Sequence, residues 1–302
     1  MKTIIVKTFA LMTVLALLLT GCAATTTTTE PTAAPTQEAT AAPETAAPAE
    51  EPQEDTADDL AGEIMITSST SAEPLVTVLS DLFMEAHPDV SIAVQGNGSS
   101  AGIKAAADGT AQLGMSSRDL KDEEKDGLTP TTICMDGIAV IVNLENPVKA
   151  LTKDQIAAIF KGEITNWKDV GGNDAEVVLI GREAASGTRD GFESITGTKD
   201  KCQYRQELTS TGDVITAVSQ NPDAIGYASL ASIKDSVKAL NVDGVTPSEA
   251  TVKDGSYKVQ RPFVLVTVED KELTPVAQKF FDYITSPDAA AIIAKAGAVA
   301  AN

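Results

Sequence analysis

From Glu63 onward, short apolar runs alternate with segments patterned as helices. The runs at 63–67 and 138–142 have the length of strands, whereas 75–86 places its apolar residues three and four positions apart, as a helix does. Alternating strand and helix patterns predict an α/β fold. We expect further strands at 90–94, 177–180, 224–227 and 263–268, and further helices at 102–108, 153–160, after Ser186, at 212–220, at 277–284 and after Pro287.

The first 22 residues have the pattern of a targeting segment. Lys2 and Lys7 precede an apolar run at 9–19 that ends in Leu19-Thr20-Gly21-Cys22. The run is long enough for a signal peptide and short for a membrane span, which needs about 20 apolar residues. The last four residues resemble a bacterial lipobox, whose cysteine is lipidated and becomes the new N-terminus. We therefore expect a signal peptide over 1–21 and a lipid on Cys22; a buried helix with an incidental cysteine is the alternative.

The next segment is too polar to fold by itself. Residues 23–62 are almost only Ala, Thr, Pro, Glu, Asp and Gln, without Lys or Arg. Such a composition cannot bury enough apolar surface to offset chain entropy, and its Ala-Pro steps favour extended backbone. The sequence predicts a disordered tether over 22–62 that holds a folded body, 63–302, off a membrane. A tail without function is the alternative.

The charge and the rare residue types exclude several functions. The chain has 43 acidic and 23 basic residues, a net charge of −20, so a nucleic-acid partner is disfavoured. One His and three Cys leave no His-rich metal site, and we expect neither metal nor other cofactor. His87, before Pro88, is expected at the surface end of a helix rather than in catalysis. Whether Cys134 and Cys202 form a disulfide is left open by the sequence.

Three loops share one design, in which a strand end is followed by Ser, Thr or Gly residues and then by a helix. They lie at 68–71, 96–102 and 181–190. A helix N-terminus offers unpaired backbone N–H groups and a partial positive charge, and hydroxyls add donors. One such loop is ordinary helix capping. Three of them, one containing Arg182, predict a site where helix N-termini converge on a tetrahedral anion.

At these residues the chain resembles the phosphate-binding lipoproteins of bacterial phosphate ABC transporters, in their Gram-positive form. The resemblance covers nearly all of 63–302. The matching stretches are Ser69-Thr70-Ser71 with Pro74, 98–104, 113–118, 136–140, 159–167, Arg182 with 186–190, and 224–227.

The resemblance implies a periplasmic-binding-protein-like (type II) fold of two α/β lobes joined by a strand hinge. Lobe I is expected to comprise 63–141 and 262–302, and lobe II 142–261. The resemblance also implies a monomer that is not an enzyme and that is anchored through Cys22 at the extracytoplasmic face of the cell membrane. Such a protein binds inorganic phosphate between its lobes and delivers it to the permease subunits of an ABC transporter. The alternatives are a binding protein for another tetrahedral oxyanion, such as sulfate or molybdate, and a phosphoesterase using Ser186 or Ser99, for which no base is evident.

The resemblance also implies the site residues. The expected phosphate contacts are Thr70, Ser71, Ser99, Ser117, Arg182, Ser186, Gly187 and Thr188, with Ser100, Asp136 and Arg189 as additional candidates. Ser117 is a departure, because some members have there an Asp that accepts the proton of hydrogen phosphate. Asp136 is our substitute acceptor, with a strand-end cap as the alternative. Arg118 and Arg189 either add charge to the site or form structural ion pairs.

Overall fold

The computed structural model describes residues 60–301. Cys22, the predicted signal peptide and the predicted tether up to residue 59 lie outside the described residues. The strands are β1 (Gly62–Ser68), β2 (Val90–Gly96), β3 (Leu113–Ser116), β4 (Leu128–Val142), β5 (Ala150–Leu151), β6 (Val178–Arg182), β7 (Gln206–Leu208), β8 (Ala224–Ser229), β9 (Lys238–Ala239), β10 (Asn241–Val242), β11 (Gln260–Val268) and β12 (Val299–Ala300). The helices are α1 (Glu73–Ala86), α2 (Ser99–Ala107), α3 (Lys153–Phe160), α4 (Gly187–Thr196), α5 (Thr211–Gln220), α6 (Glu249–Lys253), α7 (Pro275–Ile284) and α8 (Pro287–Lys295), with 3-10 turns at Asp122–Glu124, Trp167–Val170 and Leu230–Ser232.

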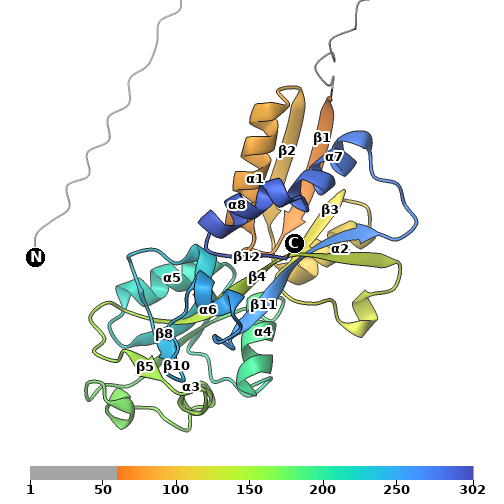
Figure 1. Ribbon diagram of the computed structural model, residues 1–302. Coiled ribbons are helices and arrows are strands. Elements are labelled where there is room, and N and C mark those ends of the chain that lie inside the picture. The colour runs from red at the N-terminus through yellow and green to blue at the C-terminus, as the bar shows by residue number, and fades with distance from the viewer. Residues whose placement is uncertain (1–59, 302) are drawn as a thin grey trace, which may run out of the picture. The chain divides into compact units, whose positions relative to one another are not determined.

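One continuous sheet runs through the described residues in the order β2-β1-β3-β11-β4-β8-β6-β7 (Figure 1). β1 pairs in parallel with β2 and with β3, and β6 pairs in parallel with β7 and with β8. The antiparallel strands β11 and β4 join these two parallel groups. The α/β fold expected from the alternating sequence pattern is confirmed.

β4 carries the sheet from one group of strands to the other. Residues 128–137 pair with β11, and residues 138–142 pair with β8. The sequence predicted only the second part, because Thr129-Pro130-Thr131-Thr132 lacks an apolar run. This first part of β4 is held in the sheet by pairing with β11, a strand that comes much later in the chain.

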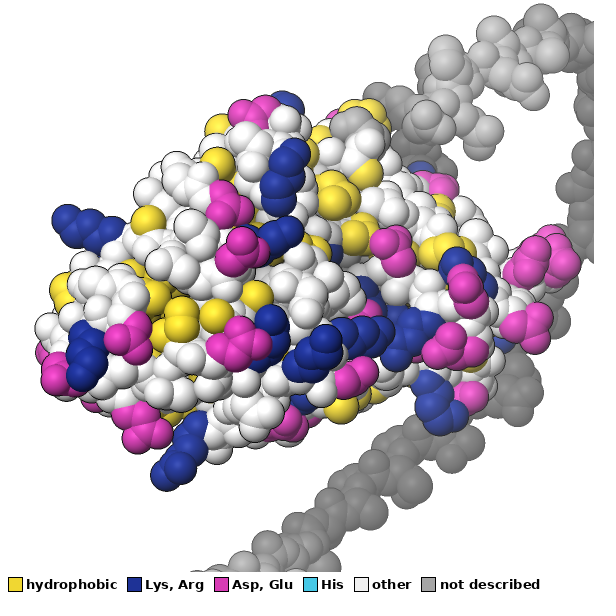
Figure 2. All heavy atoms as spheres, turned by 90° about the horizontal axis from the view of Figure 1, so that it is seen from below, with side chains coloured by type: hydrophobic (Ala, Val, Ile, Leu, Met, Phe, Trp, Pro, Cys, Tyr) yellow, Lys and Arg dark blue, Asp and Glu magenta, His cyan; other side chains and the backbone are white. Residues whose placement is uncertain are grey.

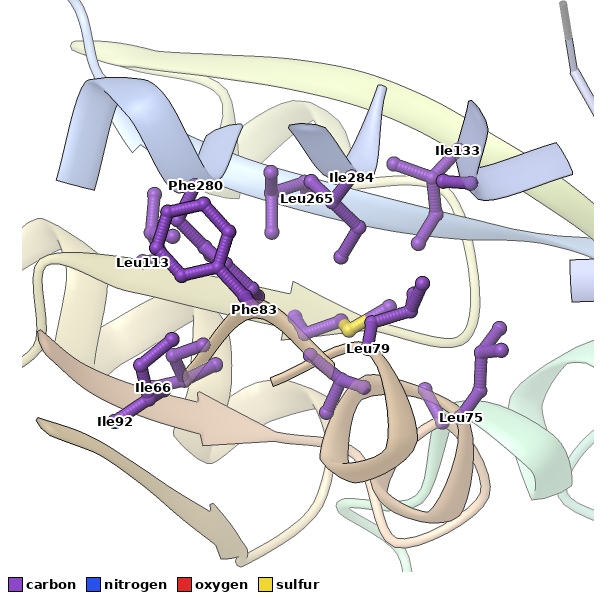
Figure 3. Packing of buried hydrophobic residues seen from close by; sticks show 14 of the residues in the cluster. Ile66, Leu75, Leu79, Phe83, Ile92, Leu113, Ile133, Leu265, Phe280 and Ile284 are labelled. Carbon is purple, nitrogen blue, oxygen red and sulfur yellow. The ribbon is translucent and has the colours of Figure 1, made fainter. Parts of the chain in front are cut away.

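A first hydrophobic core lies where α1, α7 and α8 cover strands β1 to β3. Leu75, Leu79 and Phe83 recur along the buried face of α1 at helical spacing and point toward the strands (Figure 3). The ring of Phe83 meets Phe280 of α7 edge-on at a centroid distance of 5.2 Å. Burying an aromatic side chain of this size stabilises the fold by about 1.5–3 kcal/mol. This core defines lobe I.

A second core surrounds β8 and the second half of β4. Phe192 of α4 stacks on Tyr227 of β8 with ring centroids 4.2 Å apart, and Phe160 of α3 packs against both. Trp167 is buried beneath the following glycine turn. This core, with a smaller cluster under α5, defines lobe II.

The two cores meet along β4 and β11. On β4 the first core ends at Cys134 and the second begins at Ile138. On the returning chain the second core ends at Val259 and the first resumes at Phe263. The crossing therefore lies at residues 135–137 and 260–262. The boundaries expected from the sequence, at 141 and 261, remain a prediction.

The surface, the cysteines and the helices add three observations. On the face shown in Figure 2, several Lys and Arg side chains lie next to one another in a band, with Asp and Glu side chains around it. Cys134, in lobe I, and Cys202, in lobe II, are both free thiols. Among residues 60–301, no helix has the length and apolar character needed to cross a bilayer.

Candidate functional site

The predicted loops lie at the carboxyl ends of the two parallel strand groups. In lobe I, β1 ends at Ser68 and β3 at Ser116; in lobe II, β6 ends at Arg182 and β7 at Leu208. The carboxyl ends of parallel strands share one edge of a sheet, where open α/β sheets place their ligands. Loops from both lobes therefore meet beside the strand crossing.

Three pairs of buried hydroxyl groups mark this meeting point. The Oγ atoms of Ser99 and Ser117 lie 3.1 Å apart. The Oγ1 of Thr188 donates to Ser71 Oγ at 3.1 Å, and the Oγ1 atoms of Thr70 and Thr211 are 3.3 Å apart. We call these six residues the hydroxyl cluster. Two of its pairs join lobe I to lobe II, so the cluster spans the lobes.

Gly187, the first residue of α4, lies against this cluster. A Cβ atom at Gly187 would lie 2.3 Å from Ser99 Oγ and 2.7 Å from Ser117 Oγ, closer than real Cβ contacts allow. The missing side chain lets the start of α4 approach the lobe I hydroxyls. The first amides of a helix have no partner within it, so α4 presents N–H donors there. The structure thus brings together Thr70, Ser71, Ser99, Ser117, Gly187 and Thr188, all six of which were predicted site residues.

Arg182 adds a buried guanidinium to the cluster. Its Nη1 donates to Thr211 Oγ1 at 3.0 Å, while Nε and Nη2 donate to the carboxylate of Glu183 at 2.8 and 2.9 Å. Its backbone N–H donates to the hydroxyl of Tyr227 at 3.1 Å. Burial raises the pKa of Tyr227, so this hydroxyl stays neutral. Arg182 is therefore fixed at both its backbone and its side chain.

Two residues of this site were missed by the sequence analysis, Thr211 and Arg261. Thr211 follows Ser210 at the start of α5, a Ser-Thr pair before a predicted helix that we did not count among the loops. Arg261 lies on β11, and its Nη2 donates to Thr188 Oγ1 at 3.1 Å. No local signal marks Arg261, because its neighbours in space come from β4 and α4.

Asp136 lies directly opposite Arg261 in the sheet. Its Oδ2 is 3.2 Å from Nη2 of Arg261, outside hydrogen-bond alignment, and its Oδ1 accepts from the amide of Ala231 at 3.3 Å. Burial, partly offset by the charge of Arg261, raises the pKa of Asp136 to about 6. Burial also lowers the pKa of Arg261 to about 10, and the positive charge of Arg182 adds to that effect. Asp136 reaches the hydroxyl cluster through Arg261 and Thr188.

The remaining candidates have structural contacts of their own. Ser186 caps α4, since its Oγ accepts from the amide of Arg189 at 3.3 Å. Ser100 donates from its amide and its hydroxyl to the carbonyl of Ala185, at 3.4 and 3.3 Å, a contact between the lobes.

Both additional arginines are held by carboxylates. Arg189 pairs with Glu193 at 2.8 Å and with Glu207 at 3.0 Å. Arg118 pairs with Glu124 at 2.6 Å, and its Nη2 donates to Ser100 Oγ at 3.3 Å. Structural ion pairs were one of the two alternatives left open for these arginines.

The cluster is rich in donors and poor in groups that perform catalysis. Ser99 has Ser117 as its hydroxyl partner, and the ring of His87 lies at the far end of α1 against Phe83, 4.5 Å between centroids. Among residues 60–301, no group of His, Cys, Asp and Glu has a metal-binding arrangement. The arrangement is suited to holding an acceptor by directed hydrogen bonds.

A sheet shared by two cores, with loops from both meeting at one donor cluster, defines a two-lobed α/β binding protein. A family model described as a PBP superfamily domain matches residues 26–288. The phosphate-binding protein PstS of Bacillus subtilis is 34% identical over 236 residues, which cover 76% of this chain and 77% of that protein. The chain belongs to the PBP superfamily and, within it, to the family of phosphate-binding proteins PstS.

Solved structures agree with this assignment. A phosphate ABC transporter substrate-binding protein from Clostridium perfringens, described with bound phosphate, superposes with a TM-score of 0.76 at 42% identity, covering 80% of this chain and 100% of that one. An ABC-type phosphate transport receptor from Vibrio cholerae gives a TM-score of 0.65 at 36% identity, covering 78% and 99%. The family resemblance and the two-lobed fold inferred from the sequence motifs are confirmed.

Proposed function

We propose that this protein binds inorganic phosphate at the hydroxyl cluster and delivers it to the permease of an ABC transporter. The observation that carries the proposal is the meeting of hydroxyls, the start of α4 and the buried guanidinium of Arg182 at one point between the lobes. The relatives' names support the ligand and the transport role.

The hydroxyl pairs explain how such a site receives an anion. In the structure each hydroxyl bonds to another, often across the lobes. An anion would replace these neutral bonds by charge-assisted ones, which are roughly twice as strong. Because the donors come from both lobes, the bound anion would hold the lobes together, and closure would signal the loaded state to the permease.

The proposal assigns direct contacts to Thr70, Ser71, Ser99, Ser117, Gly187, Thr188 and Arg182, and adds Thr211. Ser186 would contribute as the cap of α4. Ser100 would hold the lobes together. Arg189 would support Arg182, because Nη1 of Arg189 donates to the backbone carbonyl of Arg182 at 2.9 Å.

The proposal also retains the membrane anchor. A lipid on Cys22 would hold a monomeric folded body at the extracytoplasmic face, near its permease. Mass spectrometry of the native protein tests this: a diacylglyceryl-type mass on a chain beginning at Cys22 is expected, and an unmodified chain that retains residues 1–21 would contradict it.

Calorimetry tests the ligand. Orthophosphate, sulfate and molybdate are titrated into the purified chain, with Thr188→Val and the isosteric control Thr267→Val, which lies on β11 away from the cluster. We expect one phosphate per chain and a loss of about tenfold or more in Thr188→Val alone, because a hydrogen bond to a charged group contributes about 1.5–3 kcal/mol. Tighter binding of sulfate or molybdate would identify another oxyanion as the ligand. The absence of heat with all three would overturn the proposal.

A further inference from the structure

The guanidinium of Arg261 is buried without the full set of hydrogen bonds that buried polar groups normally have. The residue is only 3% exposed, yet its Nε and Nη1 have no hydrogen-bond partner among the described residues. Unsatisfied buried donors, especially on a charged group, are costly to a fold. The nitrogen that does have partners, Nη2, lies between Asp136 and Thr188.

The hydrogen bond to Thr188 has a direction. A guanidinium has donors and no acceptor, so Thr188 Oγ1 accepts from Arg261. The proton of Thr188 must then point elsewhere, and it points at Ser71 Oγ, 3.1 Å away on lobe I. Arg261 therefore turns a hydroxyl that could accept or donate into one that donates toward the cluster.

The position of Arg261 is fixed from several sides. Asp136 lies opposite it on β4, the ring of Phe263 lies under its Cζ with 4.8 Å to the centroid, and Gly191 of α4 lies beside its stem. A Cβ at Gly191 would lie 3.6 Å from Arg261 Cδ. Thr188 and Gly191 are three residues apart on one face of α4, so the strand crossing and this helix hold the side chain between them.

We propose that Arg261, held by Asp136, is a positioning residue for the anion site, where it orients the Thr188 hydroxyl as an obligate donor to the bound anion. This inference rests on the proposed function. It assigns Asp136 a different role from the proton acceptor expected from the sequence: its carboxylate neutralises and orients Arg261. The site then favours a ligand oxygen that carries no proton at the Thr188 position.

A double-mutant cycle tests the proposal by calorimetry with orthophosphate. Arg261→Met is combined with Asp136→Asn, so that no buried charge is left unpaired, and is measured with and without Thr188→Val. We expect Asp136→Asn/Arg261→Met to weaken phosphate binding about tenfold when Thr188 is present and less than twofold in the Thr188→Val background. Arg261→Lys, which keeps a charge and a donor, is expected to recover part of the affinity.

The control is Arg205→Met, which makes the same Arg-to-Met exchange at an exposed position and should leave phosphate affinity unchanged. Equal losses in both Thr188 backgrounds, or no loss on removing Arg261, would overturn the positioning role while leaving phosphate binding intact. Should the double variant fail to fold, Arg261→Lys is measured with and without Thr188→Val, and the losses of phosphate affinity in the two Thr188 backgrounds are compared in the same way. No heat from the wild-type protein would overturn both proposals.

Discussion

At the scale of single residues, the site depends on how closely two backbone segments approach. Gly187 has no side chain, and this brings the first turn of α4 within reach of Ser99 and Ser117. The hydroxyls and the first amides of α4 thereby lie close together, which a Cβ at position 187 would prevent.

Gly187→Ala is expected to weaken phosphate binding by about fivefold or more. The added Cβ would overlap Ser99 Oγ and Ser117 Oγ, and overpacking of this kind costs about 1–3 kcal/mol. The control is Gly212→Ala, also in the first turn of a helix, where the nearest atom to the new Cβ is Ser210 Oγ at 3.8 Å. Calorimetry measures both variants, and equal affinities for the two would contradict the close approach.

Asp136 gives the protein a dependence of stability on pH. Its folded pKa is raised from 3.8 to about 6 by burial, so between about pH 4 and pH 6 the folded chain holds a proton that the unfolded chain has lost. Its contribution to the free energy of unfolding therefore falls as pH rises through this window, by about 3 kcal/mol in all. Arg261, Cys134, Tyr257 and Ser229 are the charged, titratable and polar groups around it.

Urea unfolding of ligand-free protein at pH 4, 5, 6 and 7 measures this contribution against Asp136→Asn. The stability of the wild type relative to the variant should decline from pH 4 to pH 6 and level off above. If the free energies of unfolding of the two proteins changed in parallel with pH across the whole range, this would contradict a buried Asp136 with a raised pKa.

At the scale of elements, α2 is seated on the sheet by its glycine. Gly102 allows this close packing. A Cβ there would lie 2.7 Å from the Thr67 carbonyl oxygen and 2.8 Å from that of Met115. The helix can therefore lie directly across β1 and β3, which places Ser99, at its start, beside Ser117.

Gly102→Ala should destabilise the fold by about 1–3 kcal/mol, although alanine is the better helix former. Gly212→Ala, in the open first turn of α5, should instead stabilise by up to about 1 kcal/mol. Chemical denaturation compares the two. Stabilisation by both substitutions would show that α2 does not pack as closely as described.

The elements show where sequence reasoning succeeds and where it stops. α3 and the helices beginning after Ser186 and Pro287 were predictable, because capping residues and apolar spacing are local signals. The first half of β4 was missed because its polar stretch is ordered by β11. Arg261 was missed for the same reason: its roles depend on Asp136 and Thr188, which only the folded sheet brings to it.

At the scale of the whole folded part, the cluster connects the lobes. The pairs Ser71–Thr188 and Thr70–Thr211, and the bond from Ser100 to the Ala185 carbonyl, each cross from lobe I to lobe II. The three loop motifs predicted that the loops converge, and the family resemblance implied the same. The motifs did not predict which hydroxyls pair or which carboxylates Arg189 and Arg118 bind, because these partners depend on how the elements pack.

Phosphate should slow hydrogen exchange at the Ser100 amide, whose acceptor is on the other lobe. A ligand bound by both lobes reduces the population of separated lobes, in which this bond is broken. The amide of Gly162, bonded to Ile159 within lobe II, is the internal control and should not change. Mass-spectrometric exchange with and without orthophosphate measures both, and equal slowing of the two amides would argue against closure.

The most direct test is a crystal structure of the chain grown with orthophosphate. We predict one phosphate whose oxygens lie within hydrogen-bond distance of Ser71, Ser99, the Gly187 amide, Thr188 and Arg182, with Arg261 behind Thr188. A phosphate bound elsewhere, with the hydroxyl pairs unchanged, would contradict the central claim.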